Sequence, residues 1–293
     1  MGLTEWWNRL TGKGAKKPGV EGRGSRGAGG GSRPRRTTAP EAARGRRATG
    51  GTMPHGRPGK RPSAPDPARP VLGLDVARGG WVGALLEASG HGTPMLLTGA
   101  TAAEVVQKAG EVAVVAVDIP VGLPDDARRE ADVQTRAFLP GKASSVFTTP
   151  VREAVYAESY GQANAVNRER VGSGVSQQAF ELRRRIKEVD AWVREDLPFL
   201  VAECHPEASF AMMAGTPLTS KKRSAEGAAE RRDTLARQGI YVPTTAPTGV
   251  GTDDMLDACA AAWTAHRVKT GQARTFPEAP QTFSDGIPAA IHV

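Results

Sequence analysis

Short hydrophobic runs alternate with amphipathic stretches along the chain from Val71 onwards. The run VLGLDVA, a turn at Arg78-Gly79-Gly80 and the run WVGALLE together predict a β-hairpin. A third short strand is predicted at 95–98. The uninterrupted β-branched run VAVVAVDIP, closed by Asp118 and Pro120, predicts a strand buried on both faces of a sheet. A further apolar strand is predicted at 199–202, in FLVAE.

Helical spacing of apolar residues separates these strands. AAEVVQKAG predicts a helix that ends at Gly110, and residues 176–195 predict a longer helix with one apolar stripe. Residues 221–239 predict a charged surface helix, and the last helix begins at Asp253-Asp254, where acids suit the positive end of the helix dipole. Residues from about 122 to 198 form a helical insertion. The pattern therefore predicts one α/β domain over residues 71–293.

Residues 1–70 have a different composition, rich in Gly, Pro, Ser, Ala and Arg, and are predicted to be a disordered basic tail. This tail carries a net charge of +12, whereas the remainder of the chain carries −4. A basic tail attracts polyanions such as nucleic acid, but it is also compatible with a solvated linker or an extension upstream of a later start at Met53. The absence of a membrane span, a secretory signal or a disulfide framework predicts a cytoplasmic protein.

Carboxylates recur at the ends of the predicted strands and on the last helix. Asp75 lies in the first strand, Asp118 ends VAVVAVD and Glu203 ends FLVAE. Asp254 and Asp257 lie three residues apart, on one face of the last helix. Burying a carboxylate costs several kcal/mol unless a cation or hydrogen bonds compensate. The pattern predicts oxygen ligation of Mg²⁺ or Mn²⁺, with two ions about 3.5–4 Å apart.

Seven ordered motifs extend this interpretation. They are GLDVARGGW, VDIPVGLP, SSVF, SQQAFELRRRIKEVD, AECHPEASF, Lys221-Lys222 followed by Gly227 and Arg231, and DDMLDACAAAW. Together they resemble the DUF429 family of predicted RNase H-like nucleases over residues 71–267. The resemblance implies an RNase H-like mixed five-stranded sheet with helices on both sides. It also implies metal ligands at Asp75, at Asp118 and at Asp254 or Asp257, with Glu203 as a fourth.

Other polar residues within these motifs are candidate substrate contacts. Ser144 and Ser145 are predicted to be loop hydrogen-bonding residues near a substrate phosphate, and Lys187, Lys221 and Lys222 are candidate phosphate contacts. His205 lies at a strand-to-loop corner where a metal or substrate could bind. Arg128, Asp132 and Arg136 are spaced four residues apart and predict a salt-bridged helix surface. A zinc site, a P-loop and a GxSxG nucleophile are not encoded by the sequence.

The leading prediction is a metal-dependent nuclease that hydrolyses phosphodiester bonds of nucleic acid, with Asp75, Asp118, Glu203 and Asp257 as catalytic carboxylates. Two alternatives remain open. The first is a small-molecule phosphoryl-transfer enzyme on the same fold, for which the acidic folded domain leaves room. The second is a non-catalytic adaptor, in which the acids are structural and the tail binds nucleic acid or a protein partner.

Overall fold

The computed structural model describes residues 64–293, so most of the predicted tail lies outside the described residues. A single mixed sheet, with strand order β3-β2-β1-β4-β5-β7-β6, crosses this part of the chain. Its strands β1, β4, β5 and β7 are parallel to one another, whereas β2, β3 and β6 pair antiparallel with their neighbours. The strands are β1 (Val71–Ala77), β2 (Gly80–Leu86), β3 (Met95–Gly99), β4 (Val114–Val117), β5 (Leu200–Cys204), β6 (Thr275–Thr282) and β7 (Pro288–His292).

The mixed α/β architecture is confirmed, but the sheet has seven strands and the predicted number of five is wrong. The two additional strands, β6 and β7, form an antiparallel pair beside β5. The sequence of β6, TFPEAPQT, contains Pro277 and Pro280, which argue against a central strand because a proline has no N–H for the ladder. β6 is the edge strand of the sheet, where this constraint does not apply.

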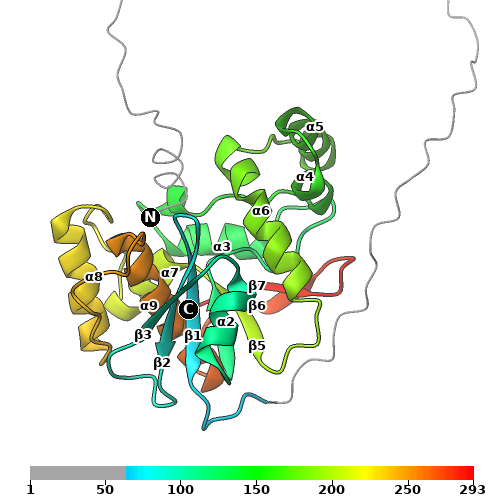
Figure 1. Cartoon of the computed structure of the whole chain (residues 1–293). Coiled ribbons are helices and arrows are strands. Elements are labelled where there is room, and N and C mark those ends of the chain that lie inside the picture. The colour runs from blue at the N-terminus through cyan, green and yellow to red at the C-terminus, as the bar shows by residue number, and fades with distance from the viewer. Residues whose placement is uncertain (1–63) are drawn as a thin grey trace, which may run out of the picture.

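Helices cover both faces of the sheet. Figure 1 shows α8 and α9 together beside the hairpin strands, and α4, α5 and α6 gathered at one end of the molecule. Among residues 64–293, no helix combines the length and hydropathy that a membrane crossing requires. The helices are α2 (Ala102–Ala109), α3 (Glu130–Phe138), the 3₁₀ turn η1 (Ala143–Ser145), α4 (Arg152–Tyr156), α5 (Tyr160–Val171), α6 (Gln177–Trp192), α7 (Pro206–Ala214), α8 (Ala225–Arg237) and α9 (Thr252–Lys269).

Most predicted helices are confirmed, and the capping residues explain where they begin. Ser176 accepts a hydrogen bond from the N–H of Ala179 at the start of α6, and Ser224 accepts one from Gly227 at the start of α8. Helix α7 was missed by the sequence analysis, which placed His205 in a loop corner. His205 is in fact the N-cap of α7, with Pro206 in the first helical turn.

Alternate residues of the central strands point to opposite faces of the sheet. Ala77, Ala116 and Cys204 belong to the hydrophobic core shared with α9, whereas Leu74 and Val115 belong to the core shared with α2 and α6. We call these two sides of the sheet the α9 face and the α6 face. This division determines which carboxylate side chains lie on the same face of the sheet.

Candidate functional site

The register of three parallel strands places Asp75, Asp118 and Cys204 side by side. Leu74 of β1 pairs with Val117 of β4, and the N–H of Asp118 donates to the Leu74 carbonyl at 3.2 Å. Val117 in turn pairs with Glu203 of β5. The next position on each strand is therefore Asp75, Asp118 and Cys204, and these three share the α9 face.

Helix α9 brings two more carboxylates to the same face. Gly73 permits the close approach, because a β-carbon at this position would lie 2.1 Å from the backbone nitrogen of Ala262 and 2.2 Å from the carbonyl oxygen of Ala258. Asp254 lies one turn before Ala258, and Asp75 lies two residues after Gly73 on the same side of the strand. Contact between β1 and α9 therefore sets the distance between the strand carboxylates and the helix carboxylates Asp254 and Asp257.

Asp75, Asp118, Asp254 and Asp257, which we call the carboxylate site, all have a raised pKa. Burial raises the pKa of Asp75 well above its ordinary value, and repulsion from the other three members, Asp257 first, raises it further. Burial followed by repulsion from Asp257 has the same effect on Asp118. The pKa of Asp254 is raised to about 6 by burial and by its acidic neighbours. Clusters of strongly perturbed pKa values of this kind occur at functional sites.

Lys222 brings a positive charge into the carboxylate site. The ammonium of Lys222 is buried and forms an ion pair with Oδ2 of Asp257. Burial raises the pKa of Asp257, and the ion pair with Lys222 opposes this shift. The sequence analysis named Lys222 only as a candidate phosphate contact, and its role as the counter-charge of a buried aspartate was not predicted.

Glu203 points to the α6 face and not into the carboxylate site. Its Oε2 accepts hydrogen bonds from Arg129 at 2.6 Å and from the N–H of Val121 at 2.7 Å. Burial raises the pKa of Glu203 to about 7, although the guanidinium of Arg129 acts in the opposite direction. Glu203 therefore lies on the opposite face of the sheet from the four aspartates, but it is close enough to Asp118 for its charge to raise the pKa of that residue.

The other predicted substrate contacts divide between the two faces. Nε2 of His205 lies 3.3 Å from the carbonyl oxygen of Ser145, so α7 and η1 meet beside the carboxylate site. Ser144 is exposed, and the Ser145 hydroxyl donates to Lys142 within its own turn. Lys221 is exposed next to the buried Lys222. Lys187 lies on α6 above the ring of Tyr156, away from the four aspartates.

The predicted salt-bridged surface at Arg128, Asp132 and Arg136 is wrong. Asp132 is buried and accepts hydrogen bonds from the backbone and the hydroxyl of Thr149. Arg136 donates to the carbonyl of Val146, and Arg128 is exposed. Helix α3 begins only at Glu130, so Arg128 precedes it and helical periodicity does not place it on the same face.

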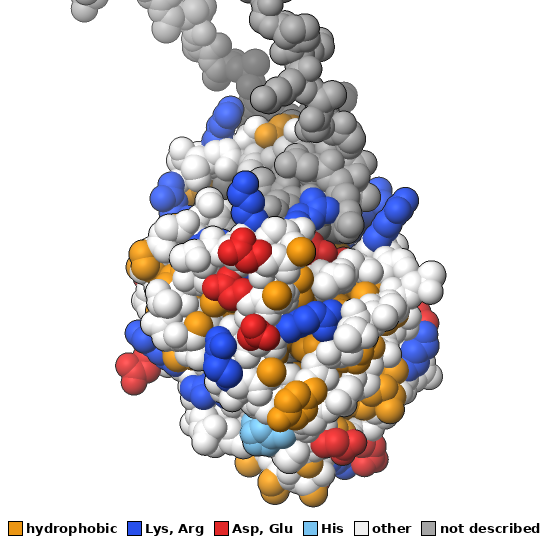
Figure 2. Space-filling view, turned by 90° about the vertical axis from the view of Figure 1, so that its left-hand side faces the viewer, with side chains coloured by type: hydrophobic (Ala, Val, Ile, Leu, Met, Phe, Trp, Pro, Cys, Tyr) orange, Lys and Arg blue, Asp and Glu red, His pale blue; other side chains and the backbone are white. Residues whose placement is uncertain are grey.

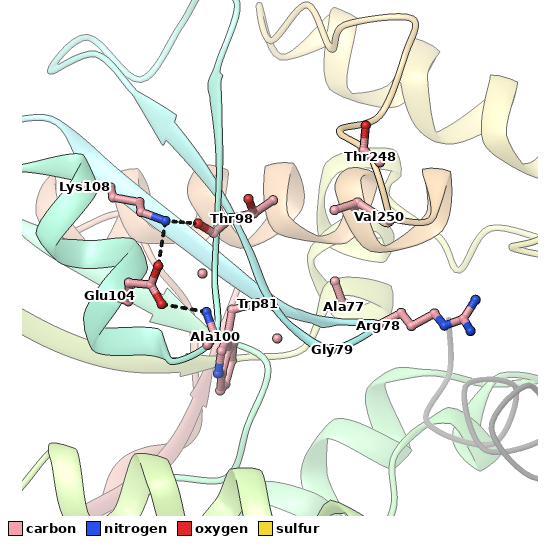
Figure 3. Close-up of a pocket in the computed structure, with 13 residues that line it drawn as sticks. Ala77, Arg78, Gly79, Trp81, Thr98, Ala100, Glu104, Lys108, Thr248 and Val250 are labelled. Carbon is pink, nitrogen blue, oxygen red and sulfur yellow. Dashed lines mark hydrogen bonds and ion pairs between the residues drawn. The ribbon is translucent and has the colours of Figure 1, made fainter.

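A cavity of about 310 Å³ opens just beyond the carboxylate site. It lies between the β1–β2 turn, the end of β3 and the loop that leads into α9, and its walls include Ala77, Thr98 and Val250. Figure 3 shows Lys108 donating to Glu104 and to the Thr98 carbonyl at one side, while Arg78 points away from the cavity. Ala77 is two residues beyond Asp75, so the cavity and the carboxylates adjoin along β1.

Comparison with protein families now adds to this geometry. The family model described as "Protein of unknown function (DUF429)" matches residues 73–282, which include every member of the carboxylate site. The chain belongs to the DUF429 family. No curated protein and no solved structure matches it.

The donor atoms of this DUF429 protein suit a hard divalent cation. All four members of the carboxylate site offer oxygen, the donor that Mg²⁺ and Mn²⁺ prefer. Oδ1 of Asp254 is buried and accepts no hydrogen bond from any residue that the structure describes. Within residues 64–293, no group of three or more His, Cys, Asp or Glu side chains is arranged to hold a metal ion.

Proposed function

We propose that this DUF429 protein is a divalent-metal-dependent phosphodiesterase that acts on nucleic acid. The observation that carries the proposal is the convergence of four aspartates, three of them buried and Asp118 half-buried, from β1, the end of β4 and α9, at one end of the sheet. Four carboxyl groups gathered in a largely buried site, where the Lys222 ammonium contacts Asp257, are costly to keep ionised unless a cation or a polar ligand compensates them. Such a site stabilises the fold less than apolar packing would, which favours a catalytic role.

The residues of the site have separate roles in the proposed reaction. Asp75 and Asp118, from adjacent strands, would hold the divalent ion, and the free oxygen of Asp254 would complete its ligands. When bound, the ion supplies Lewis-acid activation of water and stabilisation of the leaving oxygen. Gly73 keeps the helix carboxylates at a fixed distance from the strand carboxylates, and His205 fixes the neighbouring turn through Ser145.

The activity test uses the full-length protein with Mn²⁺ and labelled single-stranded and double-stranded DNA, RNA, hybrids and branched junctions. We expect cleavage that requires the metal and that falls by about two orders of magnitude or more in Asp75→Asn and Asp118→Asn. Asp233→Asn, on the exposed surface of α8, is the matched control and should cleave as the unchanged protein does. Cleavage that persists in both active-site variants would overturn the proposal.

A second candidate function is phosphoryl transfer on a small molecule such as a nucleotide. The cavity of about 310 Å³ beside the carboxylates favours it, because that volume accepts a compact ligand better than a duplex. Figure 2 also shows acidic and basic side chains interspersed over the α8 side, without the continuous basic surface that binds nucleic acid. A thermal shift with Mn²⁺-nucleotide and no cleavage of any nucleic acid would favour this candidate.

The non-catalytic adaptor predicted as an alternative has a distinct outcome. Binding of nucleic acid without turnover, together with the absence of a thermal shift with Mn²⁺ or with nucleotide, would support the adaptor. Binding that is lost when residues 1–63 are deleted would then assign the interaction to that segment.

A further inference from the structure

Lys222 is unusual among the lysines of the described chain in being almost completely buried. Only 6% of its side chain is exposed, and its ammonium reaches Asp257, whose own side chain is fully buried. Its neighbour Lys221 is exposed to solvent. A lysine loses much side-chain freedom and most of its hydration when it is buried, so its position requires a compensating partner.

The segment that carries Lys222 is fixed at several points. The Ser220 hydroxyl donates to Glu230 of α8, and the ammonium of Lys142 donates to the Ser220 carbonyl at 3.2 Å. The Ser224 hydroxyl donates to the Lys221 carbonyl at 2.8 Å. Gly227 permits α8 to contact this segment, because a β-carbon there would lie 2.0 Å from the Lys221 carbonyl oxygen. The backbone around Lys222 is therefore held in place on both sides.

We propose that Lys222 is a built-in cation of the carboxylate site, so that the site accepts one divalent ion instead of two. This inference rests on the proposed metal-dependent function and specifies its metal content. The ammonium holds the part of the site formed by α9, through Asp257, and leaves the strand carboxylates Asp75 and Asp118 to the divalent ion.

Charge and space both favour this assignment. Two divalent ions in such a site lie about 3.5–4 Å apart and share ligands between them. An ammonium in contact with Asp257 occupies one oxygen of a ligand that the second ion would need. It also repels any divalent ion that approaches within a few ångströms, because the two positive charges meet where solvent screening is weak. Lys222 is thus a positioning residue that acts through Asp257.

The experiment counts the Mn²⁺ ions bound by the full-length protein, by calorimetric titration and by the electron paramagnetic resonance signal of free Mn²⁺. The variants are Lys222→Met, Lys222→Arg and, as matched control, Lys221→Met. We expect one bound ion in the unchanged protein, in Lys222→Arg and in Lys221→Met. We expect two in Lys222→Met, because a methionine of similar length removes the ammonium and its contact with Oδ2 of Asp257.

The remaining outcomes separate this inference from the proposed function. Two ions in the unchanged protein, or one ion in Lys222→Met with its thermal unfolding transition intact, would overturn the built-in cation and leave metal dependence standing. If Lys222→Met does not fold, Lys222→Arg tests the same positive charge with less disturbance. Two ions bound by Lys222→Arg would also overturn the built-in cation. No binding by the unchanged protein would overturn the metal-dependent function itself.

Discussion

Buried acidic residues occur on both faces of the sheet, but the two faces neutralise them differently. On the α6 face, Arg129 forms an ion pair with Glu203 at 2.6 Å, and Arg152 forms ion pairs with Asp190 and Asp285. On the α9 face, Arg231 forms an ion pair with Glu207, whereas the carboxylate site is reached by Lys222 through its ion pair with Asp257. Glu203, Asp190 and Asp285 of the α6 face are therefore each paired with a guanidinium, whereas the carboxylate site of the α9 face gathers four acids with raised pKa values.

The difference shows that burial alone does not identify a functional acid. Asp190 and Asp257 are both buried, yet their pKa values are shifted in opposite directions. Burial raises the pKa of Asp190, but hydrogen bonds from Arg152, Tyr156 and Arg194 outweigh it and hold the pKa below its ordinary value. A planar guanidinium satisfies two carboxylate oxygens at once, whereas one ammonium cannot serve four carboxylates. Acids without enough counter-charge mark the candidate site.

The largest expected effect comes from removing the guanidinium that neutralises the α6 face. Arg129→Met leaves Glu203 buried without its cation and should lower the free energy of unfolding by about 3–5 kcal/mol. Arg128→Met, one residue earlier and exposed, is the control and should change it by less than about 0.5 kcal/mol. Urea unfolding measures both. Equal effects of the two variants would show that Glu203 does not depend on Arg129.

The contact between β1 and α9 is the next test, because it holds the two halves of the carboxylate site together. Gly73→Ala would force a β-carbon against the α9 backbone and should cost about 1–3 kcal/mol or more. Gly161→Ala, on the exposed surface of α5 with open space around it, should be neutral or slightly stabilising. If calorimetric unfolding shows the same stability for both variants, α9 is not held at the distance described.

The opposite charge balance of the two faces predicts opposite pH dependences. Because the pKa of Asp254 is raised to about 6 in the folded protein, the folded state holds this proton more tightly than the unfolded chain. Its contribution to stability is therefore lost as pH rises from about 4 through 6. Without metal, Asp254→Asn should reduce the loss of stability between pH 5 and pH 7.5 by roughly 1–3 kcal/mol.

The stability that Asp190 contributes depends on pH in the opposite direction. Its lowered pKa means that its stabilisation is present at neutral pH and is lost only as the solution becomes acidic enough to protonate it. Asp190→Asn should therefore destabilise the protein throughout the neutral range, in the same unfolding experiments. An unchanged pH slope in Asp254→Asn, with Asp233→Asn as the surface control, would contradict the charge imbalance of the α9 face.

The smallest effect on stability is expected from Tyr156, the neutral hydrogen-bond partner of Asp190 on the α6 face. The Tyr156 hydroxyl donates to Asp190 at 2.7 Å, and burial followed by this bond raises the pKa of Tyr156 to about 12. Tyr156→Phe should cost about 1 kcal/mol, because Asp190 retains its two arginines. Thermal unfolding measures this change. A loss as large as that of Arg129→Met would mean that the arginines alone do not neutralise this face.

Hydrophobic patterning predicted most of the strands and the long helices because each has a strong local signal. It also placed acids at Asp75 and Asp118, which the structure brings together. It could not assign Glu203 to the opposite face, because FLVAE and VAVVAVD are apolar on both sides and show no alternation. The face of Glu203 depends on the register between β4 and β5, which is a long-range property.

The counter-charges were harder to predict than the acids. Arg129 follows an exposed arginine and precedes α3, so neither composition nor helical spacing distinguishes it from Arg128. Lys222 likewise follows an exposed lysine in a segment without regular structure. In each pair of neighbouring residues, the buried one is the one that forms an ion pair with an acid more than 30 residues away along the chain. The acid is Glu203 for Arg129 and Asp257 for Lys222.

The two edges of the sheet have a consequence for behaviour at high concentration. Unpaired edge strands can recruit strands from other molecules and start aggregation. At one edge, the ammonium of Lys108 already occupies the Thr98 carbonyl of β3. At the other edge, Pro277 and Pro280 of β6 have no N–H to offer. Both edges of the sheet therefore offer fewer free backbone groups for pairing with a strand of another molecule.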